Sequence, residues 1–278
     1  MHNTVVDTCD PGLSVCLAAV GSWPVAESLA MLRRIGARRF GILAATVGSQ
    51  GWDSTMATVA ASGSRLEYIA GGARAMHDSD DGWTATLGHL RRAVDAAARN
   101  GVPTVCFTSG GSGALSWEEA ADRAVDRFAP LVEYARGAGV ALALENTMSI
   151  RSGISFVHTV ADAAELARRL EVGLCVDLYS AFQERALMGT LAANLDAIRL
   201  VQIGDHRVEA TSVPNRFVPG EGHIPLERLV REVRGLGYTG LIDLELVGPA
   251  IDADPEAALD RGLAWMRSNV PVLSRTAP

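Results

Sequence analysis

Short apolar runs alternate with longer amphipathic stretches along most of the chain. The apolar runs have the length and composition of buried strands. Eight of them occur, near residues 13–19, 39–44, 66–70, 104–108, 141–145, 173–177, 198–203 and 240–246. This rhythm predicts eight buried strands separated by other elements.

The stretches between the runs carry apolar residues at the i, i+3, i+4 and i+7 spacing of helices that bury one face. Glycine or asparagine follows several of them, as is usual where a helix ends. Clear helical patterns cover residues 25–35, 84–99, 117–135, 161–169, 225–234 and 255–268, and a weaker one covers about 53–61.

Strands that alternate with helices pair in parallel, either in a closed barrel or in an open doubly wound sheet. The open sheet would carry a glycine-rich dinucleotide turn after its first strand, but residues 20–24 read Val-Gly-Ser-Trp-Pro. The pattern therefore favours an α/β protein of the (β/α)8 TIM barrel class. We expect a single domain over residues 1–278, with loose termini at 1–12 and 271–278.

Composition excludes several kinds of protein. Hydrophobic residues make up 48% and charged residues 21% of the chain, which is typical of a globular protein. A net charge of -7 disfavours nucleic acid as a partner. All 25 basic residues are arginine. The absence of lysine excludes Schiff-base aldolases, pyridoxal phosphate enzymes and P-loop proteins, each of which needs a lysine.

The four cysteines, Cys9, Cys16, Cys106 and Cys175, are far apart, and three of them lie in strand-like runs. Such residues are usually buried free thiols, which fits the cytoplasm better than an oxidising compartment. Neither a signal sequence nor a membrane span is apparent. We expect a cytoplasmic protein that acts on a small molecule and has no membrane or nucleic-acid partner. The sequence leaves open whether it forms a homo-oligomer.

Four late strands each end in a polar residue: Glu145, Asp177, Gln202 and Glu245. In a (β/α)8 barrel the carboxyl ends of all strands meet at one face, where active sites lie. Any one of these side chains alone would more often be a helix cap or a surface ion pair, but four at strand ends are hard to explain in that way. Three converging carboxylates need a cation, and a set of oxygen ligands favours Mn²⁺ or Mg²⁺ over Zn²⁺.

The same segments carry longer motifs, which are LALEN at 142–146, GLCVD at 173–177, VQIGD at 201–205, PGEG at 219–222 and GYTG at 237–240. With Glu245 they resemble the xylose-isomerase-like TIM-barrel superfamily of sugar phosphate isomerases and epimerases. The resemblance covers residues of about 100 to 248, and its nearest branch is that of hydroxypyruvate isomerase. It implies one divalent metal ion held by Glu145, Asp177, Gln202 and Glu245.

The resemblance also implies a mechanism. Glu145 and Glu245 would exchange a proton beside a substrate carbonyl, through an enediolate that the metal stabilises. Two departures bear on it: Ser180 stands where relatives usually carry histidine, and Gln202 replaces the histidine of xylose isomerase and the ketose epimerases. Both put sugar epimerisation in doubt and leave the metal site intact.

Weaker candidates for substrate binding follow the seventh strand. Arg207 is suited to a carboxylate or phosphate, and His206 to an acid or a supporting contact. Arg216 and Glu221 flank the PGEG turn, and Glu221 resembles a family residue near the substrate. A loop salt bridge is an equally good interpretation of Arg207.

Four functions compete. The leading one is a metal-dependent isomerase or epimerase of a small, sugar-like hydroxy-carbonyl compound. A lyase or dehydratase on the same scaffold is the first alternative, since an enediolate can expel a β substituent. Phosphodiester cleavage, which relatives perform with a histidine-rich zinc cluster, and a non-catalytic barrel that only binds are weaker.

Overall fold

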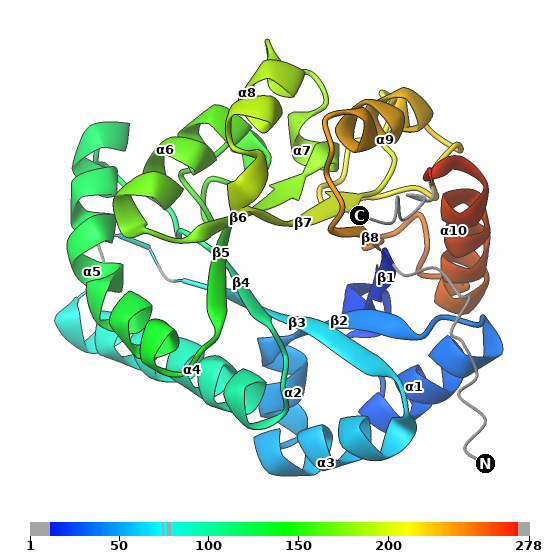
Figure 1. Ribbon diagram of the computed structural model, residues 1–278, viewed down its shortest axis with the longest axis horizontal. Helices are drawn as coiled ribbons and strands as arrows, with labels where there is room; N and C mark the ends of the chain where they lie inside the picture. Colours follow the sequence, from blue (N-terminus) through cyan, green and yellow to red (C-terminus); the bar gives the residue numbers. More distant parts are fainter. Residues whose placement is uncertain (1–11, 74, 77–78, 272–278) are drawn as a thin grey trace, which may run out of the picture.

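Eight parallel strands close into one barrel in the order of the sequence, with β8 paired to β1 (Figure 1). The computed structural model describes residues 12–73, 75–76 and 79–271. The strands are β1 (Leu13–Cys16), β2 (Arg39–Leu43), β3 (Arg65–Gly72), β4 (Thr104–Thr108), β5 (Ala141–Glu145), β6 (Gly173–Asp177), β7 (Ile198–Ile203) and β8 (Leu241–Leu244). The predicted single-domain TIM barrel is confirmed.

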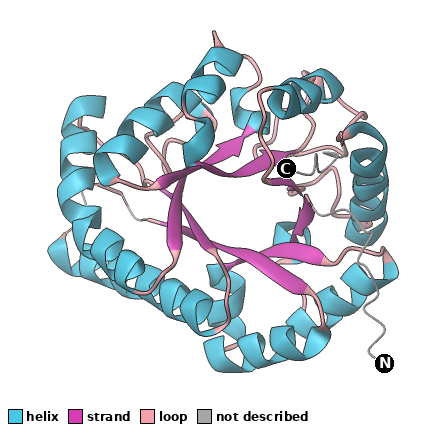
Figure 2. Ribbon diagram, in the orientation of Figure 1, coloured by secondary structure: helices cyan, strands magenta, loops and turns pink. Residues whose placement is uncertain are grey.

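A ring of helices surrounds the barrel (Figure 2). They are α1 (Val25–Arg34), α2 (Ala44–Gln50), α3 (Trp52–Ser62), α4 (Asp80–Arg99), α5 (Trp117–Gly137), α6 (Val160–Leu170), α7 (Leu178–Ala181), α8 (Leu187–Ala193), α9 (Leu226–Gly235) and α10 (Pro255–Asn269). Short 3-10 turns are η1 (Leu17–Val20), η2 (Ser149–Arg151) and η3 (Leu195–Ala197). The long helices start at caps that the sequence supplies; at α5 the Ser116 side chain and Glu119 form a reciprocal capping box.

The structure differs from the sequence-based expectation at several short elements. The first apolar run leaves the sheet after Cys16, because Leu17 and Val20 turn inward in η1. Helices α2, α7 and α8 were not predicted. Seven residues or fewer carry too little periodicity to reveal a helix, and tertiary contacts stabilise it instead. The expected weak helix at 53–61 is confirmed as α3.

A small cluster fills the inside of the barrel, separate from the large core between strands and helices. It consists of Cys16, Tyr68, Cys106, Ala143, Cys175 and Leu200. The three cysteines are buried free thiols, as predicted. The Tyr68 ring lies against β2 at Gly41, where an added Cβ would come within 2.0 Å of the ring. Glycine at position 41 therefore makes room for the tyrosine inside the barrel.

The expected loose termini at 1–12 and 271–278 lie outside the described residues, apart from Gly12 and Pro271. Among the helices that are described, none combines the length and the apolar character needed to cross a membrane.

Candidate active site

The carboxyl mouth is the end of the barrel where the strands' carboxyl ends meet, and it receives all four predicted residues. Glu145 ends β5 and Asp177 ends β6. Gln202 of β7 is the register partner of Asp177. Glu245 follows β8 directly, and its backbone N–H donates to the Ile203 carbonyl at 2.9 Å. The barrel register thus brings four residues that are far apart in sequence to one face, as the strand-end pattern predicted.

Asp177 is the most fully bonded of the four. Its side chain is 1% exposed. Its Oδ1 accepts from Arg216 Nη1 at 3.0 Å and from the Tyr179 N–H at 3.1 Å. Its Oδ2 accepts from Arg216 Nη2 at 2.9 Å and from Ser180 Oγ at 2.6 Å. Ser180, at the place where relatives usually carry histidine, is therefore a hydrogen-bond donor to Asp177.

Asn146 fixes the ends of β5 and β6 to each other. Its Nδ2 donates to the Asp177 carbonyl at 3.1 Å, and its Oδ1 accepts from the Asp177 N–H at 2.9 Å. The side chain is completely buried. Asn146 belongs to the LALEN motif, but no pattern in the sequence indicated that it holds the backbone of Asp177.

Arg216 joins two of the carboxylates. It lies in the β7–α9 loop (residues 204–225), is 3% exposed and stacks on the Tyr179 ring at 4.4 Å. Besides its two bonds to Asp177, its Nη1 lies 3.1 Å from Glu245 Oε2, an ion pair without hydrogen-bond geometry. Burial alone would lower the pKa of Arg216, but the charges of Asp177 and Glu245 outweigh burial and raise it.

Asp205 holds the loop that carries Arg216. Its Oδ1 accepts from the backbone N–H groups of His206 and Ile224, and its Oδ2 from those of Gly220 and Gly222, all within 3.0 Å. It is completely buried. Four amides converging on one carboxylate close the β7–α9 loop into a fixed shape. The backbone of Arg216 is held as well, by a bond to the Val247 carbonyl at 2.9 Å.

Glu145 and Glu245 carry the least compensated charge. Burial raises the pKa of Glu145 well above its usual range, and the charges of Glu245 and Asp177 raise it further. Burial also raises the pKa of Glu245, although Arg216 opposes the shift. In the described part of the chain the Glu145 side chain makes no hydrogen bond or ion pair, and Glu245 Oε2 is buried without a hydrogen bond.

Gln202 is 1% exposed, and its Oε1 accepts from Cys175 Sγ at 3.1 Å. The thiol lies in the barrel interior and therefore orients the amide from below. One lone pair of the amide oxygen stays available for another partner.

The donor set fits a divalent cation in type and in charge. Three carboxylates and one amide offer oxygen ligands of the kind that hard ions prefer. Their charge exceeds what one guanidinium neutralises, and the Glu145 and Glu245 oxygens lack hydrogen-bond donors. The positions of these side chains, in contrast, do not form a metal site. Among the described residues no three acidic, histidine or cysteine side chains are gathered closely enough to hold an ion, and Arg216 is bonded to Asp177.

The remaining substrate-binding candidates lie in the same loop but turn to different partners. Arg207 Nε donates to the Glu221 carbonyl at 2.7 Å, and the Glu221 side chain pairs with Arg261 of α10 at 2.9 Å. His206 packs edge-on against Tyr179 at 5.8 Å, and its buried Nδ1 has no hydrogen bond. His206 thus adjoins the Arg216 site, whereas Arg207 bonds to Glu221 and Glu221 pairs with the surface helix α10. Their role in substrate binding stays a prediction.

A further buried carboxylate lies below Glu245, deeper in the barrel. Asp243, two residues before Glu245 on β8, is completely buried and accepts from Ser14 Oγ and from Tyr68 OH, the latter at 2.8 Å. Burial raises its pKa to about 7, although the two hydrogen bonds oppose the shift. Asp243, Ser14 and Tyr68 were not predicted as site residues from the sequence. A charged residue inside an apolar strand run was the available signal.

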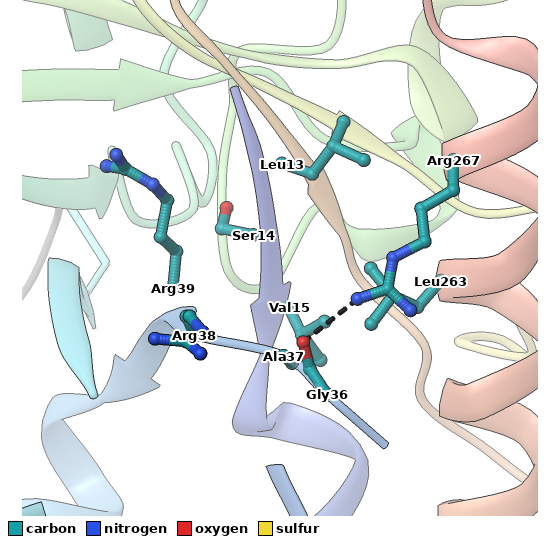
Figure 3. Close-up of a pocket in the computed structure, with 9 residues that line it drawn as sticks. All are labelled: Leu13, Ser14, Val15, Gly36, Ala37, Arg38, Arg39, Leu263 and Arg267. Carbon is teal, nitrogen blue, oxygen red and sulfur yellow. Dashed lines mark hydrogen bonds between the residues drawn. The ribbon is translucent and has the colours of Figure 1, made fainter. Parts of the chain in front are cut away.

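A small pocket at the opposite end of the barrel is unrelated to this site (Figure 3). It is lined by the starts of β1 and β2 together with Arg38 and Arg267, and Arg267 Nη2 donates to the Gly36 carbonyl at 2.9 Å. Its free volume is about 10 Å³, too small for a substrate.

The fold and the site together define a class, a (β/α)8 barrel with an acidic centre at its carboxyl mouth. The family profile of the xylose isomerase-like TIM barrel matches residues 59–269, more than half of the chain. The chain belongs to this family, which confirms the resemblance. No curated protein sequence matches it.

Solved structures share the fold at low sequence identity. A protein of Sinorhizobium meliloti 1021, SMc04130, superposes with a TM-score of 0.83 at 23% identity, over 94% of this chain and 99% of its own. The 3-keto-D-glucoside 4-epimerase YcjR from E. coli gives 0.76 at 20%, over 92% and 99%. The zinc-bound IolI protein gives 0.77 at 18%, over 93% and 98%. YcjR and a further neighbour, L-ribulose 3-epimerase, are thus sugar epimerases, and the IolI structure holds zinc.

Proposed function

We propose that the protein is a divalent-metal-dependent isomerase or epimerase of a small, sugar-like hydroxy-carbonyl compound. One observation carries the proposal: Glu145 and Glu245 approach one mouth from β5 and β8, with Asp177 and Gln202 on the strands between them. Membership of the family and the sugar epimerases among its structural neighbours support this class.

Glu145 and Glu245 are the proton carriers in this proposal. Each is partly exposed at the mouth, and each can hold a proton, which an amide cannot. Standing on two sides of a substrate, one carboxylate would take the proton beside the carbonyl and the other would return it. A proton returned to the opposite face gives epimerisation, and one returned to the neighbouring carbon gives isomerisation.

A bound Mn²⁺ or Mg²⁺ would supply the Lewis acid that stabilises negative charge on the substrate oxygens. Glu145, Asp177, Gln202 and Glu245 would hold it. Asp177 is one methylene shorter than glutamate and lies deeper, so it acts as a ligand only. Cys175 orients the Gln202 oxygen, and Ser180 and Asn146 fix Asp177.

The experiment combines metal content with product analysis. Protein stripped with a chelator and reloaded with Mn²⁺, Mg²⁺ or Zn²⁺ is incubated with a panel of ketoses, keto acids and inososes in D₂O. A product of unchanged formula that carries solvent deuterium beside the carbonyl is expected. A fully active metal-free protein would contradict the proposal.

A lyase remains the second candidate because of one observation: both imidazoles of the epimerase pattern are replaced, by Ser180 and Gln202. In their place the structure has a serine hydroxyl bonded to Asp177 and an amide bonded to a thiol. The same incubations separate the two reactions, since a lyase product has lost water or a fragment. A non-catalytic barrel would bind metal or sugar without any turnover.

A further inference from the structure

We propose that Arg216 is an internal cation that competes with the divalent ion for Asp177, so that the ion enters only when the guanidinium leaves this carboxylate. The inference rests on the proposed function, because it takes the metal site as given. It assigns Arg216 a role in regulating metal binding, in addition to the substrate contact predicted from the sequence.

Hydrogen-bond donors occupy all the lone pairs of Asp177. A carboxylate offers about four lone-pair positions in its plane. At Asp177 two are taken by Arg216 Nη1 and Nη2, one by the Tyr179 N–H and one by Ser180 Oγ. An ion that binds Asp177 must displace one of these donors. The Tyr179 N–H is fixed in the backbone of α7 and the Ser180 hydroxyl is neutral, so the guanidinium is the donor that the charge of an arriving ion opposes.

Electrostatic repulsion also favours departure of the guanidinium when the ion binds. Arg216 lies 3.1 Å from Glu245 and bonds to Asp177, so a divalent ion on these two carboxylates would stand beside a buried positive charge. Like charges at such a distance repel strongly where water is scarce. The guanidinium and the ion therefore weaken each other's binding, and the weakening is mutual.

The loop allows the side chain to move while the backbone stays. Asp205 and the bond to the Val247 carbonyl fix the backbone around Arg216. The Nε atom is buried without a hydrogen bond, so only the two terminal nitrogens anchor the guanidinium. Rotation of the side chain along the Tyr179 ring breaks those bonds without unfolding the loop.

The test compares Mn²⁺ affinity in the full chain by calorimetry and by electron paramagnetic resonance, with Arg216→Met beside the wild type. Arg234→Met is the matched control. Arg234 is also a buried arginine, bonded to two carbonyls and stacked on Tyr238. It lies on α9, and its bonds are at the opposite end of the barrel. We expect Arg216→Met to bind Mn²⁺ at least tenfold more tightly than the wild type, and Arg234→Met to bind as the wild type does.

Equal or weaker binding by Arg216→Met overturns the competition and leaves the proposed function standing. Absence of Mn²⁺ binding in every variant overturns the metal requirement of the proposed function, and the competition with it. A second measurement does not depend on the variant's folding. In a crystal of the wild type grown with Mn²⁺, we expect Asp177 on the ion and Arg216 no longer bidentate on it. An ion bound by Asp177 with both Arg216 bonds retained overturns the inference.

Discussion

Ser180 Oγ donates a hydrogen bond to Asp177 Oδ2 at 2.6 Å, at the position where relatives of this barrel usually place a histidine. The hydroxyl cannot reach a substrate while it is committed to the carboxylate. It therefore acts on Asp177, whose orientation it helps to fix.

Ser180→Ala should lower stability by about 2 kcal/mol, the usual effect of losing a hydrogen bond to a buried charge. Chemical denaturation of the metal-free protein measures this. The exposed Ser268 on α10 provides the control, and Ser268→Ala should be nearly neutral. If Ser180→Ala is equally neutral, the bond to Asp177 is not a stabilising one.

Glu145→Gln and Glu245→Gln should both retain measurable Mn²⁺ and lose roughly 10²- to 10⁴-fold in kcat, because glutamine keeps a carbonyl oxygen but cannot carry the proton. Metal titration beside single-turnover rates checks each variant at saturating Mn²⁺. Near wild-type turnover in both variants would exclude the proton-transfer mechanism and favour a lyase or a purely Lewis-acid reaction.

Gln202→Glu should keep the metal and part of the activity, since it replaces one oxygen ligand by another. Gln202→Ala should weaken Mn²⁺ binding, and excess Mn²⁺ should partly restore its rate. The two variants are compared by the Mn²⁺ concentration that gives half-maximal activity. The same value for Gln202→Ala and the wild type would remove Gln202 from the set of ligands.

Asp243 should make the stability of the metal-free protein depend on pH. In the folded chain its pKa is raised to about 7 from an ordinary value of 3.8. Between these values the folded state binds a proton that the unfolded state has lost. The stabilisation is therefore complete below pH 4 and is lost as the pH rises through 7.

Asp243→Asn mimics the protonated side chain and removes this dependence. Its stability relative to the wild type should rise by up to about 1.4 kcal/mol per pH unit between pH 4 and 7 and then level off. Denaturation in EDTA at several pH values gives the comparison. A constant difference across that range would show that Asp243 is not protonated in the folded protein.

Asp205→Ala should destabilise the protein by about 3 kcal/mol or more, because it leaves four backbone N–H groups of the β7–α9 loop without their acceptor. Proteolysis should then cut within residues 204–225. Asp254→Ala, which removes a single exposed cap from α10, is the control and should cost about 1 kcal/mol. Equal effects of the two changes would contradict the role of Asp205 as the loop's anchor.

The sequence by itself determined the barrel and the four strand-end residues. Strand burial and helical periodicity depend on neighbouring positions, so the local pattern predicts eight strands. It also places Glu145, Asp177, Gln202 and Glu245 at strand ends. A parallel barrel then brings strand ends together whatever the loops do. Short elements such as α2 and α7 were missed because few residues show no periodicity.

The tertiary structure alone decided what those residues bond to. Arg216 was a loop arginine in the sequence; its pairing with Asp177 depends on the path of the β7–α9 loop, which Asp205 sets through amides up to 19 positions away. Asp243 is one charge in an apolar run of the sequence, and only the closed barrel places Ser14 of the neighbouring β1 and Tyr68 of β3 against it. Such contacts join residues far apart in sequence, and no local pattern encodes a partner that only the closed barrel brings near.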